Sequence, residues 1–235
     1  MIRNKCIYIV VLMTITTIMV YAQQYNAESD FNVTRTADGN SVVITGYTGT
    51  SQIVNIPPQI RQLPVTSIGN EAFRSKGLIE VTIPDGVIRI GNRAFESNSL
   101  TNINIPSSVT HLGNYAFSSN RLEIVILTSG IVEIGSYAFE MNRLTSLIIP
   151  DTVTNIGIYA FANNSSLETL VLPNNIKIDQ GAFNNYSLKK ITIGNNANLS
   201  SFVTSFVNGF DQFYRAGGRR AGTYVYNNGS WSEEW

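Results

Sequence analysis

Apolar and polar residues alternate in an order that repeats every 22 residues along the middle of the chain. In the copy around Leu144, the alternation of Leu147 and Ile149 with their neighbours predicts a short strand whose two apolar side chains point inward. Pro150 ends this strand because proline lacks a backbone donor. A fixed period of this length indicates a solenoid, in which each coil buries its apolar side against its neighbours.

Six copies of one phrase carry the period, and each ends in Ala-Phe. They begin at Ile68, Ile90, Leu112, Ile134, Ile156 and Ile178. We expect two stacked columns inside the solenoid. The phenylalanines are Phe73, Phe95, Phe117, Phe139, Phe161 and Phe183, and the leucines are Leu78, Leu100, Leu122, Leu144, Leu167 and Leu188. Because stacked strands lie ~4.8 Å apart, a stack of about seven coils predicts a spine about 30 Å long.

Two turn positions recur in the same phase. In the first five copies a glycine follows the apolar residue that begins the phrase, as Gly157 follows Ile156. We expect this position to be open to positive φ. Asn98, Asn120 and Asn142 each lie two residues before a column leucine, and asparagine tolerates a left-handed turn. The sixth copy has Asp179 in place of the glycine, which indicates a local adjustment near the end of the stack.

A solenoid exposes its core at both ends, so we expect a cap at each end. Alternation in residues 31–36 and 41–46, around an Asp-Gly turn at 37–40, predicts an N-terminal hairpin. A helical stripe predicts a helix over the last coil, although a ligand platform is the alternative interpretation of the same aromatics. The stripe contains Leu199, Phe202, Val203, Phe206, Val207, Phe210 and Phe213. The glycines after Ala216 break this helix, and residues 224–231 predict a closing hairpin.

The repeated string IGxxAFxxNxLTSLxIPxxVTxIG resembles the BspA-type leucine-rich repeat of bacterial surface and secreted proteins. The resemblance covers Val42 to Ile193, and the segment from Ile44 to Gly69 is similar to the usual first coil of that family. It implies a repeat solenoid, mostly strand and loop, with a parallel sheet on its concave face. We expect four parts. Residues 1–22 form a signal peptide, residues 23–67 form the N-terminal cap and first coil, residues 68–193 form the six repeats, and residues 194–235 form the C-terminal cap.

The first 22 residues have the pattern of a secretory signal peptide. Arg3 and Lys5 precede an apolar run from Cys6 to Val20, and the small residue Ala22 follows. An uncleaved membrane anchor is the alternative, but the run is shorter than the ~20 residues of a spanning helix. We therefore expect cleavage after Ala22 and a protein that is secreted by a bacterium or displayed on its surface, without stable membrane insertion.

Charge and cysteine content exclude several classes of function. Cys6 is the only cysteine, so the chain after cleavage would have no disulfide and no cysteine metal site. Without Arg3 and Lys5 the chain has 14 basic and 16 acidic residues, a net charge of −2. Because no basic tract is present, we expect no nucleic-acid partner.

The sequence offers little support for catalysis. His111 is the only histidine, and it occupies a variable position of the repeat, so we expect a solvated loop residue rather than a base. Glu123 and Glu168 share one repeat position but lie two coils apart, ~10 Å, which gives weak support for an acid–base pair. No triad, metal-ligand or phosphate-loop motif occurs. We expect no enzyme, no metal and no cofactor.

The outward strand positions form two rows that are candidates for partner binding. The first row is Ile53, Glu80, Asn102, Ile124, Ser146, Thr169 and Lys190, and the second is Asn55, Thr82, Asn104, Ile126, Ile148, Val171 and Thr192. Ile124, Ile126, Ile148 and Val171 adjoin one another across three coils. Either β-branched residues simply suit strands here, or they form an apolar patch for a partner, rimmed by Glu80, Asn104 and Lys190.

The leading hypothesis is a non-enzymatic binding module, because repeat surfaces bind extended partners through many shallow contacts. The resemblance implies adhesion to a host matrix protein or to another cell surface, and it does not identify the ligand. One alternative is a carbohydrate-binding or enzyme-accessory module, in which Tyr224, Tyr226, Trp231 and Trp235 stack on sugars. A structural spacer without a ligand is the other alternative.

Overall fold

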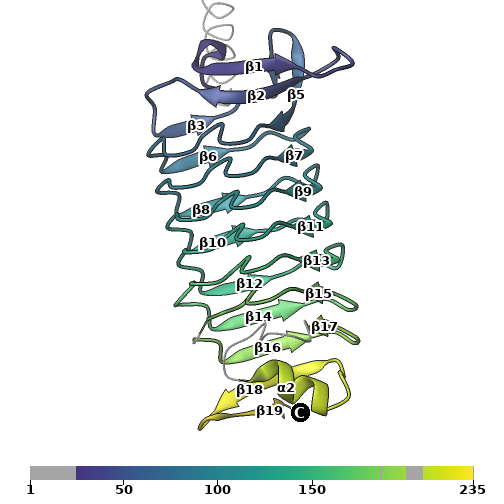
Figure 1. Cartoon of the computed structure of the whole chain (residues 1–235). Helices are drawn as coiled ribbons and strands as arrows, with labels where there is room; N and C mark the ends of the chain where they lie inside the picture. The colour runs from purple at the N-terminus through teal and green to yellow at the C-terminus, as the bar shows by residue number, and fades with distance from the viewer. Residues whose placement is uncertain (1–24, 186, 200–208, 235) are drawn as a thin grey trace, which may run out of the picture.

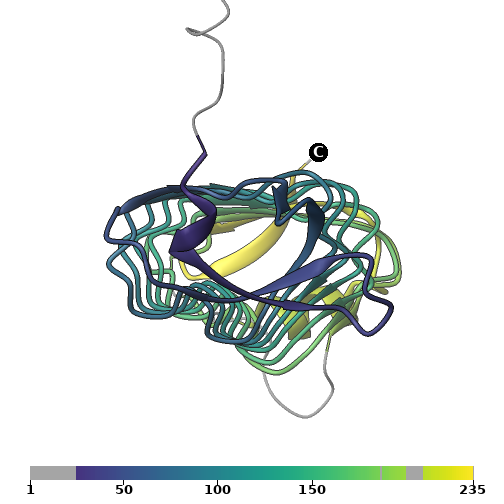
Figure 2. The ribbon, with the colours of Figure 1, turned by 90° about the horizontal axis from the view of Figure 1, so that it is seen from above.

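Short parallel strands stack on two sides of the molecule and give a single solenoid with a cap at each end (Figure 1). This computed structural model describes residues 25–185, 187–199 and 209–234. Seen along the axis, the outlines of successive coils nearly superimpose (Figure 2). The 22-residue period of the sequence therefore corresponds to one coil.

One side, here called the wide face, carries the strands that the alternation predicted. They are β3 (Ile53–Asn55), β6 (Glu80–Thr82), β8 (Asn102–Asn104), β10 (Ile124–Ile126), β12 (Ser146–Ile148), β14 (Thr169–Leu172) and β16 (Lys190–Ile193). Parallel pairs keep equivalent residues of neighbouring coils in register, as in β12 and β14, where Ile148 lies opposite Val171. The two rows of outward side chains run across this face.

The other side, here called the narrow ladder, consists mainly of two-residue strands that the sequence pattern did not predict. It contains β5 (Leu63–Ile68), β7 (Arg89–Ile90), β9 (His111–Leu112), β11 (Glu133–Ile134), β13 (Asn155–Ile156), β15 (Lys177–Ile178) and β17 (Asn198–Leu199). A short strand, β4 (Gln59–Ile60), pairs antiparallel with β5. The second residue of each two-residue strand is buried, and the first faces outward.

The predicted phenylalanine column is confirmed. All six rings from Phe73 to Phe183 are fully buried. Consecutive rings stack with centroids 4.9–5.4 Å apart and interplanar angles of 0–13°. The leucine column beside it is buried as well. Burial of apolar surface between neighbouring coils is therefore the main stabilising term of the stack.

The recurring glycine is required for a different reason from the one expected. At Gly91, Gly113, Gly135 and Gly157 the prediction of positive φ is wrong. A Cβ at any of these four positions would lie 2.6–2.7 Å from backbone atoms of the preceding coil. Close approach of the coils, rather than a left-handed backbone, therefore requires glycine.

The recurring asparagines are also not turn residues. Asn98, Asn120 and Asn142 are buried, and the residue before each one adopts positive φ instead, as at Ser119 and Met141. The Asn142 amide donates to the carbonyls of Phe117 and Phe139 at 3.0 and 3.1 Å, and its Oδ1 accepts the Leu122 N–H at 3.0 Å. The same bonds extend this buried ladder to Asn164, which the sequence pattern missed.

The N-terminal cap is the predicted hairpin. A 3₁₀ turn (Glu28–Asp30) leads into β1 (Phe31–Arg35), which pairs antiparallel with β2 (Val42–Tyr47). In turn, β2 pairs parallel with β5, so the hairpin continues the narrow ladder. Phe31 and Tyr47 extend the aromatic stack beyond Phe73 and close the core at this end.

The C-terminal cap contains a helix and a hairpin, as predicted. The helix α2 (Phe210–Ala216) ends before the glycines, while Leu199 belongs to β17, where it pairs with Ile178, and is not helical. Phe202, Val203, Phe206 and Val207 lie outside the described residues. The closing hairpin consists of β18 (Gly222–Asn227) and β19 (Ser230–Glu234). Because β18 pairs antiparallel with β16, the hairpin continues the wide face.

Candidate functional site

The wide face presents an apolar patch that the packing of the solenoid does not require. Ile124, Ile126 and Ile148 are 60%, 53% and 67% exposed. Val171 lies next to Ile148 in register and is half-buried. We call these four residues the isoleucine patch. Monomeric proteins rarely expose contiguous apolar surface without a role, so the patch is the first candidate for an interaction site.

The sheet of the wide face is interrupted at this patch, as it also is between β6 and β8. β10 pairs with β8, and β12 pairs with β14, but β10 and β12 belong to separate sheets. A cavity of about 290 Å³ opens at the interruption and is lined by residues 123–127 and 146–148. Val125 and Leu127 are half-buried there, although the equivalent Ile103 and Ile105 of the previous coil are buried. The patch therefore includes a hollow as well as a raised row of side chains.

The coil that contains β10 also differs from its neighbours in sequence. Thr128 occupies the position at which adjacent coils have Pro106 and Pro150. Its hydroxyl donates to the Ile105 carbonyl of the previous coil at 2.9 Å. Thr128 thus distinguishes the coil in which Val125 and Leu127 are only half-buried.

The remaining candidate residues lie around the patch at different distances. Asn104 is directly opposite Ile126 in the parallel pair of β8 and β10, so it borders the patch. Glu80 lies on β6, two coils from β10, and Lys190 forms an ion pair with Glu234 of the closing hairpin at 2.5 Å. The polar outward positions between them are Thr82, Asn102, Ser146 and Thr169.

In the described part of the C-terminal cap, the aromatics do not form a platform for sugars. Tyr224 and Trp231 are only 5% and 6% exposed. Their rings contact the Phe210 ring edge to face, with centroids 5.6 and 4.8 Å apart. Tyr226 packs against the same cluster, and Trp235 lies outside the described residues. Tyr224 and Trp231 therefore close the core instead of presenting a ring face to a sugar, and among the described residues this removes the main support for that alternative.

The residues considered for catalysis do not come together. Glu168 forms an ion pair with Lys189 at 2.6 Å rather than facing Glu123. His111 is not in a loop as expected, because it begins β9 on the narrow ladder, where its Nδ1 lies 2.8 Å from the hydroxyl of Thr110. Within the part of the chain that the structure describes, no three His, Cys, Asp or Glu side chains cluster so that they could hold a metal.

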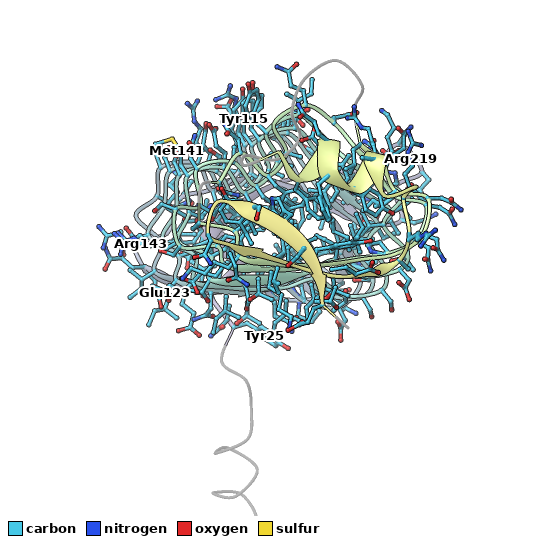
Figure 3. The ribbon with its side chains drawn as sticks, turned by 90° about the horizontal axis from the view of Figure 1, so that it is seen from below. Tyr25, Tyr115, Glu123, Met141, Arg143 and Arg219 are labelled. Atoms are coloured by element: carbon cyan, nitrogen blue, oxygen red, sulfur yellow. The ribbon has the colours of Figure 1, made fainter. Side chains whose placement is uncertain are left out.

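A stacked row of tyrosines, which sequence reasoning missed, runs along another side. Tyr115, Tyr137 and Tyr159 stack with centroids 4.6 and 5.4 Å apart, and the Arg93 guanidinium lies 4.5 Å from the centre of the Tyr115 ring. Tyr115 lies on the opposite side of the coil from Tyr25 (Figure 3). Because each ring covers the next, the row offers ring edges rather than free faces to a ligand.

One carboxyl group beside this row is electrostatically perturbed. Burial raises the pKa of Glu140, and a hydrogen bond from the Asn163 amide at 3.2 Å partly opposes this change. Burial, followed by the nearby Tyr115, also raises the pKa of Tyr137. Both shifts have an ordinary cause in burial of the side chains between coils.

Comparisons with known proteins agree with this fold. The model of the BspA type leucine rich repeat region matches in six copies, over residues 54–141 and 99–206. A leucine-rich repeat protein from Bacteroides ovatus is 26% identical over 77% of this chain, with a TM-score of 0.58, and this chain spans 58% of its length. The Treponema pallidum leucine rich repeat protein is 22% identical over 75% of this chain and 86% of its own, with a TM-score of 0.51. None of the curated proteins matches.

Proposed function

Because the chain belongs to the BspA-type leucine-rich repeat family, we propose that it is a non-enzymatic surface repeat protein that binds a protein partner through its wide face. The observation that carries this proposal is the isoleucine patch, with its three exposed isoleucines beside a hollow in the sheet. Interfaces of this kind have an apolar centre and a polar rim. Asn104 and the polar outward residues of neighbouring strands supply such a rim.

An extended segment of a partner fits this face better than a small molecule. The outward rows continue across the coils at the ~4.8 Å spacing of paired strands, so equivalent side chains meet a partner at regular intervals. The hollow between β10 and β12 would receive an apolar side chain, and the isoleucines around it would exclude water. The candidate contact residues are Glu80, Thr82, Asn102, Asn104, Ile124, Ile126, Ser146, Ile148, Thr169, Val171 and Lys190.

Changing Ile148 to lysine should abolish partner binding and leave the fold intact. Ile148 is 67% exposed, so the substitution removes little core packing. In the complex, however, the ammonium would be desolvated without a counter-ion. We expect affinity to fall about 30-fold or more, which corresponds to a hot-spot loss of about 2 kcal/mol or more. Binding to a panel of purified extracellular matrix proteins and to epithelial cells, together with thermal unfolding, measures both effects.

Ile88 provides a matched control, because it is another isoleucine that is 46% exposed but precedes β7 on the narrow ladder. Ile88→Lys should bind like the wild type. Equal binding by a folded Ile148→Lys protein would remove the site from the wide face. Absence of binding by the wild type to every matrix protein and cell tested would favour the spacer alternative.

We further propose that the protein is exported and that residues 1–22 are removed. The basic start, the apolar run and Ala22 support export. No helix within the described residues is long and apolar enough to span a membrane. Surface location is consistent with the family and brings the wide face into contact with partners outside the cell.

Amino-terminal sequencing of protein recovered outside the cell tests this proposal. The sequence should begin at Gln23, or be blocked by cyclisation of that glutamine, because cleavage is expected after Ala22. Protein that retains Met1 would show that residues 1–22 are an anchor or a leader that is not removed.

A further inference from the structure

A polar groove runs along the narrow ladder, on a different side from the isoleucine patch. Its volume is about 430 Å³, within the range of ligand sites. Its floor is the column of Gly91, Gly113, Gly135 and Gly157, where side chains are excluded by the backbone of the preceding coil. It ends at the sixth copy, where Asp179 replaces the glycine and pairs with Lys177 at 2.9 Å. The groove therefore crosses several coils.

One wall of the groove presents a regular row of amide donors. The side-chain oxygens of Asn70, Asn92 and Asn114 accept the backbone N–H of the equivalent residue in the next coil, at 2.8, 2.8 and 2.9 Å. Because each oxygen is occupied, the amide nitrogen is the group that remains for a ligand. Within the described residues, none of these three nitrogens forms a hydrogen bond to the protein. The donors repeat once per coil.

The opposite wall consists of side chains that include hydrogen-bond donors, hydrogen-bond acceptors and charges of both signs. Arg89, His111, Glu133 and Asn155 are in register on adjacent strands of the narrow ladder. The Nδ1 of His111 lies against Thr110, which leaves Nε2 for a ligand. The Oδ1 of Asn155 is buried and has no partner among the described residues. A buried acceptor without a partner costs about 1–3 kcal/mol, so a donor from a ligand would offset that cost.

From this arrangement we infer that the groove binds a linear, uncharged polysaccharide. Each sugar unit of such a chain carries hydroxyl groups that can donate and accept hydrogen bonds. These groups match the donors and acceptors that the two walls of the groove present in each coil. A polyanion would meet Glu133 and Asp179, whose negative charges balance those of Arg89 and Lys177. An extended peptide is disfavoured because its apolar side chains would find no apolar pocket among these polar walls.

Titration with neutral oligosaccharides of increasing length tests the inference. The probes are β-1,4-linked glucose and mannose chains from the disaccharide to the hexasaccharide, with oligogalacturonates as the charged counterpart. We expect the neutral hexasaccharide to bind at least about tenfold more tightly than the disaccharide, because a longer chain contacts more coils. Charged chains of equal length should bind at least about tenfold more weakly than neutral ones, because their carboxylates would lose hydration in a groove that offers no net positive charge to offset the loss.

A pair of matched double variants locates the site. Glu133→Ala with Asn155→Ala removes two groove side chains, and Glu80→Ala with Asn102→Ala removes the same residue types from outward positions of the wide face. Only the groove variant should lose about tenfold or more in affinity for the hexasaccharide. The inference is overturned if no neutral chain binds, if affinity does not depend on length, if the charged chains bind as tightly, or if the two variants lose affinity equally. Ile148→Lys should leave sugar binding unchanged, which separates this site from the proposed protein-binding face.

Discussion

Replacing Phe139 with alanine is expected to lower the free energy of unfolding by about 3–5 kcal/mol, the range for a large aromatic in a close-packed core. Phe139 is fully buried and stacks between Phe117 and Phe161, with ring centroids 5.4 and 5.2 Å away. The substitution removes both contacts and leaves a cavity in the middle of the column, where flanking coils fix the spacing. Chemical denaturation monitored by circular dichroism measures the loss.

Glu123→Ala is the control for this experiment, because Glu123 belongs to the same region of the stack but is exposed. Its effect should stay within about 0.5 kcal/mol, as for most surface substitutions. Equal destabilisation by the two variants would show that the assignment of inward and outward positions is wrong.

Replacing Asn142 with alanine should be almost as destabilising, although it removes no large apolar group. The variant leaves the Leu122 N–H and the carbonyls of Phe117 and Phe139 without the amide that bonds them. Each buried polar group without a partner costs about 1–3 kcal/mol. We expect a loss of about 2–4 kcal/mol, smaller than the sum because the carbonyls retain other bonds.

Asn163→Ala distinguishes the ladder from a general sensitivity of the turns. Asn163 immediately precedes the ladder residue Asn164, but it is exposed and its amide only reaches Glu140 at 3.2 Å. It also has positive φ, so alanine there should cost no more than about 1–2 kcal/mol. A small effect of Asn142→Ala in denaturation would mean that water replaces the ladder bonds.

The sequence predicted the coil, the two apolar columns and the N-terminal hairpin, because their signals are periodic and repeated. It did not reveal the narrow ladder, since a strand of two residues is too short to show alternation. The roles of glycine and asparagine were also misassigned. Both residues suit left-handed turns, and only the distance between coils shows that Gly135 avoids a backbone contact and that Asn142 bridges two coils.

The candidate surfaces were predicted to different degrees. Alternation placed Ile126 and Ile148 on the outside correctly, because inward and outward positions follow from a period of two. The interruption between β10 and β12 was not predicted, because the pattern of apolar and polar residues is the same in coils whose strands pair and in coils whose strands do not. The polar groove depends on side chains from the first positions of strands that the pattern missed, so His111 was assigned to a loop.

The asparagine ladder also constrains how such a chain can change in length. Each of its cross-coil bonds joins residues one coil apart, so the coils of the ladder bond to their neighbours through equivalent residues. Duplication or loss of a whole coil in the gene restores the same bonds at the new junction, whereas a partial coil leaves buried groups unpaired. Lineages can therefore extend or shorten the stack in steps of ~4.8 Å without redesigning the core. Each step lengthens or shortens the wide face and the groove by the same amount. The length of these surfaces can therefore change in evolution without a change in the residues that contact a partner.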